Sequence, residues 1–508
     1  MQAEPDFEAF SARYKAGEAG VVRATLVGDL ETPVAAFLKL RQGHGGAAFL
    51  LESVEGGAVR GRYSMIGLDP DLVWRCRDGE AEIDRAPPGA VGGGGFVPDR
   101  RPPLESLRAL IAESAIPRSG DLPPMAAGLF GYLGYDMVRL MERLPEPNPD
   151  ALGVPDAILV RPTVMVVFDA VRDEISLITP VRPQSGVSAK AAYESALARL
   201  ERAMWSLERP LPFDARHDPM ALNVHSPRSN TSEAEFMGLV ERAKEYIRAG
   251  DVFQVVLSQR FEAEFPLPAF ALYRSLRRVN PAPFLCYLDF EAFQIVCSSP
   301  EILVRVRDGT VTIRPIAGTR PRGATAAEDK RLADELLADP KERAEHLMLL
   351  DLGRNDVGRV AELGSVTVTD SFFLEHYSQV MHIVSNVEGR LDPSHDALDA
   401  LVAGFPAGTV SGAPKVRAME IVDELEKEKR GPYAGCIGYF GANGEMDTCI
   451  VLRTAIVKDG RMSVQAGAGI VYDSDPAFEQ QECVNKAKAL FRAAEDAVRF
   501  ASRARRGQ

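Results

Sequence analysis

The stretch between residues 465 and 490 constrains the fold of this chain most, because a strand, a glycine pair and a helix follow one another within it. The strand-like apolar run ends in Gly467-Ala468-Gly469. Glycine lets a backbone turn sharply and direct its N–H groups at an anion. After Pro476 the apolar spacing becomes that of a helix. The segment therefore predicts either an anion-binding turn or a bulge in a strand.

Carboxylates lie on one face of this predicted helix. Glu479, Glu482 and Lys486 stand at i, i+3 and i+7, a spacing that stacks their side chains. Such a face can hold a metal ion or can be an ordinary solvated salt bridge, and the spacing leaves both open. A second predicted helix presents Glu342 and Glu345 at the same three-residue spacing. One or two carboxylates from each helix would suffice for Mg²⁺, which takes hard oxygen ligands and keeps bound water.

Composition excludes several classes of function. The 508 residues allow two or three domains, and the net charge of −13 argues against nucleic acid or an anionic membrane as a partner. The acidic N-terminus lacks an apolar core, and no run approaches the roughly 18 apolar residues of a membrane span. We therefore expect a cytoplasmic protein. The cysteines have no paired spacing and suggest neither a zinc site nor a disulfide framework; they are Cys76, Cys286, Cys297, Cys436, Cys449 and Cys483.

The chain divides at a connection rich in proline and aspartate, residues 210–230. A second break, from Pro87 to Pro103, carries four consecutive glycines and predicts a flexible loop or a linker between subdomains. Helical spacing around Pro33–Leu40 is the clearest helix signal in the strand-rich first part. We expect an N-terminal domain at residues 1–225 and a C-terminal domain at residues 226–508.

The second region combines strands that pair as hairpins with capped helices. Three dipeptides of the tight-turn type each join two strand-like runs: Asp308-Gly309, Asn443-Gly444 and Asp459-Gly460. Two helix starts carry capping patterns, Ser232 with Glu235 and Thr325 with Glu328. These signals predict an α+β fold of largely antiparallel β-sheets flanked by helices.

Longer motifs resemble the chorismate-utilising enzymes, and the chain as a whole is similar to the anthranilate synthase component I family. The similarity runs from about Leu26 to Leu490. It is carried by L-L-E-S, G-R-Y-S, D-V-F-Q-V-V-L-S-Q-R, S-S-P-E, P-I-A-G-T-R, A-E-H-L-M-L-L-D-L-G-R-N-D, G-T-V-S-G-A-P-K, D-T-C-I-V-L-R, Q-A-G-A-G-I-V and E-Q-Q-E-C-V-N-K-A.

The resemblance implies a magnesium-dependent site. The magnesium ligands of the family fall on Glu345 and Glu482, with Glu342 and Glu479 beside them, and the ion would clamp the ring carboxylate of chorismate. Metal, guanidinium and oriented amides together hold carboxylates without net positive charge. The implied substrate-binding residues are Gly318, Thr319, Tyr433, Arg453, Gly467, Ala468, Gly469 and Lys486.

The reaction implied has two parts. Ammonia adds at C2 while the C4 hydroxyl leaves, and pyruvate is then eliminated to give anthranilate. Glu301 is the expected general acid for the departing hydroxyl, with a pKa that burial should raise. His382 is assigned to the elimination half, although a lone histidine in a strand is more often structural.

Two positions discriminate among relatives of the family. Aminodeoxychorismate synthases carry a nucleophilic lysine where this chain has Ala317, and isochorismate and salicylate synthases carry a lysine, able to activate water, where it has Gln254. Alanine cannot act as a nucleophile and glutamine cannot activate water, so a ready nucleophile such as ammonia is needed.

The ammonia is expected from another chain. The segment around Cys436 imitates the cysteine elbow of a glutamine amidotransferase, G-x-C-x-G-x-Q, but has Ala434 and Phe440 at two of its positions. A separate glutaminase subunit, anthranilate synthase component II, is therefore implied, in a heterotetramer of two large and two small subunits.

The resemblance also implies feedback inhibition by L-tryptophan, through L-L-E-S and N-P-x-P. The regulatory residues are then Ser53, Pro283, Phe284 and Leu285, with Asn280. From the residues alone, a core strand end and a proline-shaped loop explain the same segments. A rival hypothesis is a catalytically dead relative that only binds tryptophan or a partner; the complete set of acids with Arg453 and His382 speaks against it.

Overall fold

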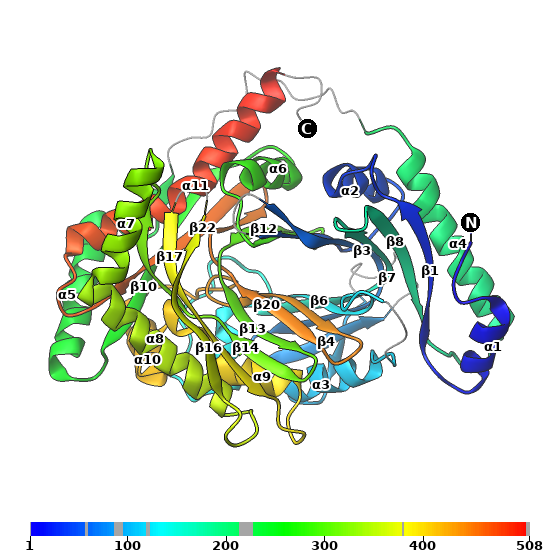
Figure 1. The fold of residues 1–508 in the computed structure, drawn as a ribbon, viewed down its shortest axis with the longest axis horizontal. Helices are drawn as coiled ribbons and strands as arrows, with labels where there is room; N and C mark the ends of the chain where they lie inside the picture. Colours follow the sequence, from blue (N-terminus) through cyan, green and yellow to red (C-terminus); the bar gives the residue numbers. More distant parts are fainter. Residues whose placement is uncertain are drawn as a thin grey trace.

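The computed structural model describes residues 2–55, 59–85, 95–117, 122–212, 227–377 and 380–503. Two layers of strands pack face to face, and helices cover the outer face of each layer (Figure 1). Every strand pairing among the described residues is antiparallel. The predicted α+β class is confirmed.

The first layer begins and ends with strands from opposite regions of the chain. In hydrogen-bonded order its strands are β1 (Gly20–Val27), β8 (Glu174–Val181), β7 (Ala157–Asp169), β3 (Val59–Arg77), β2 (Ala48–Glu55), β11 (Phe284–Asp289), β12 (Gln294–Ser299), β21 (Thr454–Lys458), β22 (Arg461–Ile470) and β10 (Gln254–Glu264), with the short β9 (Arg228–Ser229) and β18 (Gly412–Ala413) paired to β10.

The second layer shares the two long strands β3 and β7 with the first. Their other halves pair into a sheet of β5 (Val97–Asp99), β4 (Glu80–Arg85), β3, β7, β6 (Gly128–Leu133), β19 (Cys436–Gly441), β20 (Met446–Ile450), β13 (Ile302–Arg307), β14 (Thr310–Ile313) and β17 (Val380–Arg390), with β15 (Ile316–Pro321) and β16 (Thr367–His376) paired to β17.

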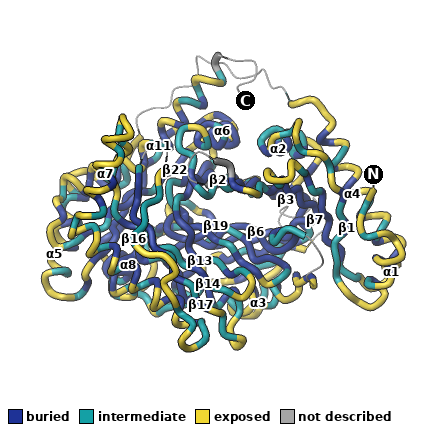
Figure 2. Tube along the Cα trace, viewed as in Figure 1, coloured by how far each residue is buried: buried dark blue, intermediate teal, exposed yellow. Residues whose placement is uncertain are grey.

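Three large hydrophobic cores hold the described parts of these layers together, and a smaller one lies under α7. One lies between the two sheets and includes Phe49, Phe130 and Ile437. The outer core of the first layer is closed by α1 (Phe7–Lys15), α2 (Pro33–Arg41), α4 (Ala189–Glu208), α6 (Ala269–Val279) and α11 (Pro476–Arg503). On the other side lie α3 (Pro103–Glu113), α5 (Glu233–Ala249), α7 (Ala326–Ala338), α8 (Pro340–Gly358), α9 (Ala397–Gly404), α10 (Lys415–Leu425) and the 3₁₀ turns η1 (Tyr135–Leu140) and η3 (Gly408–Val410). Figure 2 shows the buried strands of both layers enclosed by helices with exposed outer faces.

The local signals for turns and helix starts are confirmed. Asp308-Gly309 joins β13 to β14 with φ of 49° and 73°, a conformation that a tight hairpin requires. The Ser232 hydroxyl accepts from the Glu235 amide at the start of α5. The predicted box at α7 is only half formed, because the Glu328 carboxylate accepts from Ala324 rather than from the cap residue.

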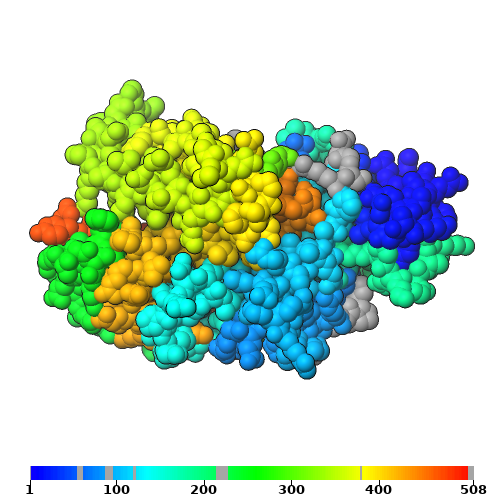
Figure 3. All heavy atoms as spheres, turned by 90° about the horizontal axis from the view of Figure 1, so that it is seen from below, coloured from blue at the N-terminus to red at the C-terminus, as the bar shows by residue number. Residues whose placement is uncertain are grey.

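Strand pairing crosses the predicted domain boundary twice. Strand β2 pairs with β11, and β6 pairs with β19. Figure 3 shows the blue and cyan N-terminal segments packed along yellow and orange C-terminal ones. The division into residues 1–225 and 226–508 stays a prediction, and the two regions share both sheets.

Two predicted connections fall partly outside the described residues. These are residues 86–94 of the glycine-rich stretch and residues 213–226 of the proline-rich connection. Within the first stretch, Val97–Asp99 forms the edge strand β5. No helix within the described ranges is long and apolar enough to cross a membrane.

Candidate active site

The glycine pair lies inside β22, which corrects the predicted turn or bulge. Gly467 and Gly469 pair in regular register with Ser258 and Val256 of β10. The glycines are needed for close approach: an added Cβ at Gly467 would lie 2.8 Å from the Tyr433 hydroxyl, and one at Gly469 would lie 2.5 Å from the amide nitrogen of Gln254. The strand can therefore pass directly beside both side chains.

Helix α11 begins six residues after β22 ends, and the face that carries Lys486 packs against the same strand. The Lys486 ammonium group donates to the Gly467 carbonyl at 2.9 Å and pairs with Glu482 at 2.6 Å. The salt-bridge alternative left open by the spacing is thus present. It also holds a cation beside the predicted substrate-binding strand.

The acids of α8 and α11 lie close enough to influence one another. Burial, and then the charges of Glu342 and Glu482, raise the pKa of Glu345, whose carboxylate accepts from Gln254 at 3.2 Å. Burial and Glu482 also raise the pKa of Glu479. Lys486 pairs with Glu482, and Arg320 pairs with Glu342 at 2.8 Å, yet like charges held this close still disfavour ionisation. A bound cation would relieve this repulsion.

These carboxylates fit Mg²⁺. All four donors are hard oxygens, and the two predicted ligands, Glu345 and Glu482, come from different helices. The acids do not form a compact set of three, since the one such group among the described residues consists of cysteines. An ion held by two carboxylates would complete its octahedron with water and substrate oxygens, as Mg²⁺ commonly does.

Glu301 lies between β12 and β13, buried beside Arg453. Its pKa is raised to about 8 because burial outweighs the hydrogen bond from Thr409, at 2.9 Å, and the charges of Arg453 and Lys486. A partly open pocket, lined also by Leu349 and Gly408, borders its side chain. The predicted raised pKa is supported, and a carboxyl group that stays protonated at neutral pH can donate a proton.

His382, on β17, is held neutral and oriented. Its Nδ1 lies 3.0 Å from the Thr319 hydroxyl and 3.1 Å from the Gly318 carbonyl. Burial, aided by the charge of Arg453, lowers its pKa to about 4. The carbonyl can only accept, so Nδ1 carries the proton and the free Nε2 is the basic nitrogen.

Arg453 occupies a constrained position between β20 and β21. Its φ is 48°, a left-handed conformation that is uncommon for a residue with a side chain. The removal of water lowers its pKa, and its positive charge acts on both Glu301 and His382. The fold therefore brings a cation between the proposed acid and the proposed base.

The predicted residues extend from the surface into the interior. Thr319 and Lys486 are exposed, whereas Glu301, His382 and Tyr433 are buried. The buried pair of Arg430 with Glu426 stacks behind the Tyr433 ring, with the guanidinium 5.7 Å from its centroid. A small anion entering beside Lys486 would meet acid, base and guanidinium together.

The comparison with known proteins decides the family. Residues 60–492 match the model of the chorismate binding enzyme family, a span that includes strands of both layers but not β1 and β2. The chain belongs to the chorismate-binding enzymes. The predicted resemblance is confirmed.

Several relatives of this chorismate-binding enzyme that match it over nearly their full length are named anthranilate synthase component 1. It is 57% identical to anthranilate synthase component 1 of Cereibacter sphaeroides, with 99% of each chain covered. It is 47% identical to the protein of that name from Thermus thermophilus, with 93% of this chain and 97% of the relative covered. The crystal structure of anthranilate synthase component I from Streptococcus pneumoniae has a TM-score of 0.75 at 38% identity, covering 92% of this chain and 98% of that one. The menaquinone-specific isochorismate synthase of Escherichia coli, at 19% identity and a TM-score of 0.69, shares the fold.

Sequence reasoning about this chorismate-binding enzyme missed two residues at the site. Thr409, which hydrogen-bonds Glu301, lies in the G-T-V-S-G-A-P-K motif and could have been found there. Tyr377 packs edge-on against His382 at 5.5 Å between ring centroids, and its charge state influences Arg453. No spacing pattern marks Tyr377, because it follows the end of β16 and reaches the site only through strand pairing.

The predicted regulatory residues also meet in the structure. Ser53 on β2 stands directly opposite Phe284 on β11, and its hydroxyl donates to the Tyr63 carbonyl at 3.1 Å. Leu285 is buried, while Pro283 and Phe284 are half-buried. The two motifs, more than 200 residues apart in sequence, are thus neighbours across one strand pair.

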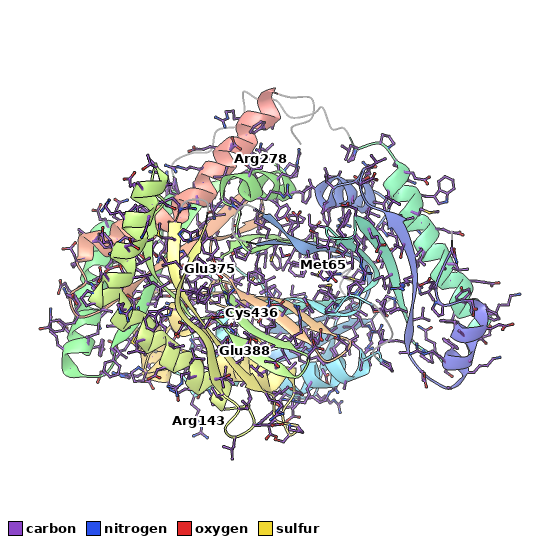
Figure 4. The ribbon with its side chains drawn as sticks, in the orientation of Figure 1. Met65, Arg143, Arg278, Glu375, Glu388 and Cys436 are labelled. Atoms are coloured by element: carbon purple, nitrogen blue, oxygen red, sulfur yellow. The ribbon has the colours of Figure 1, made fainter. Side chains whose placement is uncertain are left out.

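The segment around Cys436 cannot act as a nucleophile elbow. Cys436 lies within β19 in the interior of the fold, where burial raises its pKa to about 12 (Figure 4). A glutaminase needs an exposed, readily ionised thiol. The sequence argument against an amidotransferase site here is supported by this position.

Proposed function

We propose that this chorismate-binding enzyme is the large subunit of an anthranilate synthase, which converts chorismate and ammonia to anthranilate and pyruvate. The observation that carries the proposal is the meeting of a protonated carboxyl group, a neutral imidazole and a guanidinium group at Glu301, His382 and Arg453. The full-length relatives support the choice of reaction.

Binding of a dianionic substrate would use the cations of the site. Arg453 and Lys486 would hold the enolpyruvyl carboxylate, with Tyr433 and the backbone at Gly467 beside it. When bound by Glu345 and Glu482, Mg²⁺ would supply positive charge to the ring carboxylate. These local charges explain how a chain of net charge −13 could bind an anion.

The two proton-transfer steps would use different side chains. Glu301, protonated below about pH 8, donates its proton to the leaving C4 hydroxyl. His382, neutral above about pH 4, accepts the ring proton at Nε2 during loss of pyruvate. The opposite pKa shifts of these groups, both caused mainly by burial, match an acid and a base.

Ammonia is the proposed nucleophile because the two positions that distinguish the relatives, Gln254 and Ala317, carry no side chain that can act as a nucleophile or activate water. Gln254 donates its amide to Glu345 and so supports the metal site instead of activating water, and Ala317 is buried on β15. A component II glutaminase would supply the ammonia, in the expected heterotetramer. The six free thiols support the cytoplasmic localisation expected from the sequence.

The test is formation of anthranilate by the purified chain alone. With chorismate, Mg²⁺ and an ammonium salt at alkaline pH, we expect anthranilate fluorescence to rise, because free ammonia can enter the site. Glutamine should support the reaction only after a glutaminase subunit is added. Turnover of glutamine by the isolated chain would contradict the proposal, and a folded chain that forms no product from ammonia would favour the binding-only relative.

We also propose that tryptophan inhibits this enzyme at the β2–β11 junction, since Ser53 and Phe284 face each other there. In wild type, tryptophan should weaken chorismate binding by about 5- to 150-fold, the usual range of allosteric coupling. Ser53→Phe should fill the site and relieve this inhibition. Ser53→Ala, which leaves space, is the matched control and should stay inhibited. Calorimetry that shows equal tryptophan binding by wild type and Ser53→Phe would exclude this site, provided that both retain ammonia-dependent turnover.

A further inference from the structure

Three buried cysteines from distant parts of the chain meet between the two sheets. Cys286 and Cys297 stand opposite each other on β11 and β12 of the first layer, and Cys449 lies on β20 of the second. Their sulfur atoms all lie within 4.8 Å of one another. Their residues are 5%, 0% and 1% exposed. No spacing pattern marks this cluster in the sequence, because only the packing of the sheets brings its members together.

The separation of the sulfurs suits a metal ion. Metal–thiolate bonds are about 2.3 Å long, so three sulfurs around one trigonal ion lie about 4 Å apart. The Ser299 backbone N–H also lies beside the Cys297 sulfur, where it could donate to a bound thiolate.

The number and softness of the ligands select the ion. Structural zinc takes four ligands in a tetrahedron, and iron–sulfur clusters use four cysteines, whereas this group in the described residues has three members. The core around it is apolar, with Leu288, Ile295 and Val451, and the hard oxygen that the structure places in contact with it is the Leu452 carbonyl, 3.7 Å from the Cys297 sulfur. Soft sulfur ligands in a dry environment favour Cu(I).

We propose that Cys286, Cys297 and Cys449 form a binding site for one Cu(I) ion that joins the two sheet layers. Each thiol that becomes a ligand thiolate releases its proton to solvent, and the oxidation state of copper does not change. The site is separate from the proposed magnesium site and does not depend on the proposed reaction.

The cysteine cluster lies close to the proposed catalytic residues, so a bound copper ion should affect them. Cys297 lies four residues before Glu301, near the end of β12. Its thiol contacts the carbonyl of Leu452, the residue before Arg453. Cys286 directly follows Leu285. An ion that draws the three strands together would shift the backbone on which Glu301 and Arg453 are held. We therefore expect copper to lower turnover as well as to bind.

The test is anaerobic dialysis of the full chain against Cu(I) buffered by a chromophoric chelator, with copper per chain measured by atomic absorption. Wild type should retain one copper, whereas Cys449→Ala and Cys286→Ala should retain none. Cys436→Ala is the matched control: Cys436 lies on β19, beside β20, but packs in the core on the opposite face of that sheet. This variant should bind like wild type.

X-ray absorption of the copper-loaded wild type gives a readout that needs no variant. We expect three sulfur neighbours at about 2.3 Å from the ion. Folded wild type that holds no copper, either after dialysis or after growth in copper-supplemented medium, would overturn the proposal. So would retention by Cys449→Ala equal to that of wild type, or a spectrum with fewer than three sulfur neighbours.

Discussion

Glu345→Gln and Glu482→Gln, each made singly, should abolish magnesium-dependent anthranilate formation. The two carboxylates come from different helices, and their like charges repel each other. A metal ion that neutralises substrate charge contributes several kcal/mol to the transition state, so loss of either ligand should lower turnover by about 10³-fold or more. Steady-state rates with ammonium as nitrogen donor, measured over a magnesium titration, test this expectation.

Glu495→Gln provides the matched control, because Glu495 is exposed further along α11. It should leave both the rate and the magnesium requirement unchanged. The double variant of Glu345 and Glu482 should be no worse than either single one, since each already removes the ion. Calorimetry in which Glu482→Gln binds Mg²⁺ with the wild-type Kd would remove this residue from the ligand set.

Glu301→Gln should lower turnover by about 10²- to 10⁴-fold, the usual contribution of a general acid. Glutamine keeps the size of the side chain and can still accept from Thr409, but it has no proton to give. Chorismate binding should change little, so the loss is expected in kcat rather than in KM. Glu388→Gln, six residues beyond His382 on β17, is the matched control.

The pH profile gives an independent check on Glu301. Its protonated form is the competent one, so wild-type kcat at a fixed concentration of free ammonia should fall as the pH rises through about 8. The residual activity of Glu301→Gln should lack this fall. A wild-type profile that stays flat to well above pH 8 would exclude Glu301 as the acid.

The raised pKa of Glu301 also predicts that the folded chain loses stability as the pH rises. The folded chain holds the Glu301 proton up to about pH 8, whereas the unfolded chain releases it near the ordinary value of 4.5. The unfolding free energy should therefore fall by up to about 5 kcal/mol between these pH values, because the folded state binds the extra proton. Glu301→Gln should not show this slope and should unfold at a higher temperature than wild type at pH 8.

Local chemistry was readable from the sequence. Asp308-Gly309 and Asp459-Gly460 each predict a tight turn, because Asp and Gly adopt the positive φ angles that such a turn needs. Ser232 predicts a helix start, because its hydroxyl accepts a hydrogen bond from the first turn of the helix that follows it. The long motifs indicated the family and the site residues for the same reason: each motif is a short segment whose residue types serve one site.

What only the tertiary structure decided is how distant segments meet. The sequence could place Gly467 at the end of an apolar run but could not show that Tyr433 needs the space of its missing side chain. It could not show that the two regions share both sheets, nor that Cys286, Cys297 and Cys449 converge. Strand order and sheet packing set these contacts, and they depend on burial over the whole chain rather than on any local pattern.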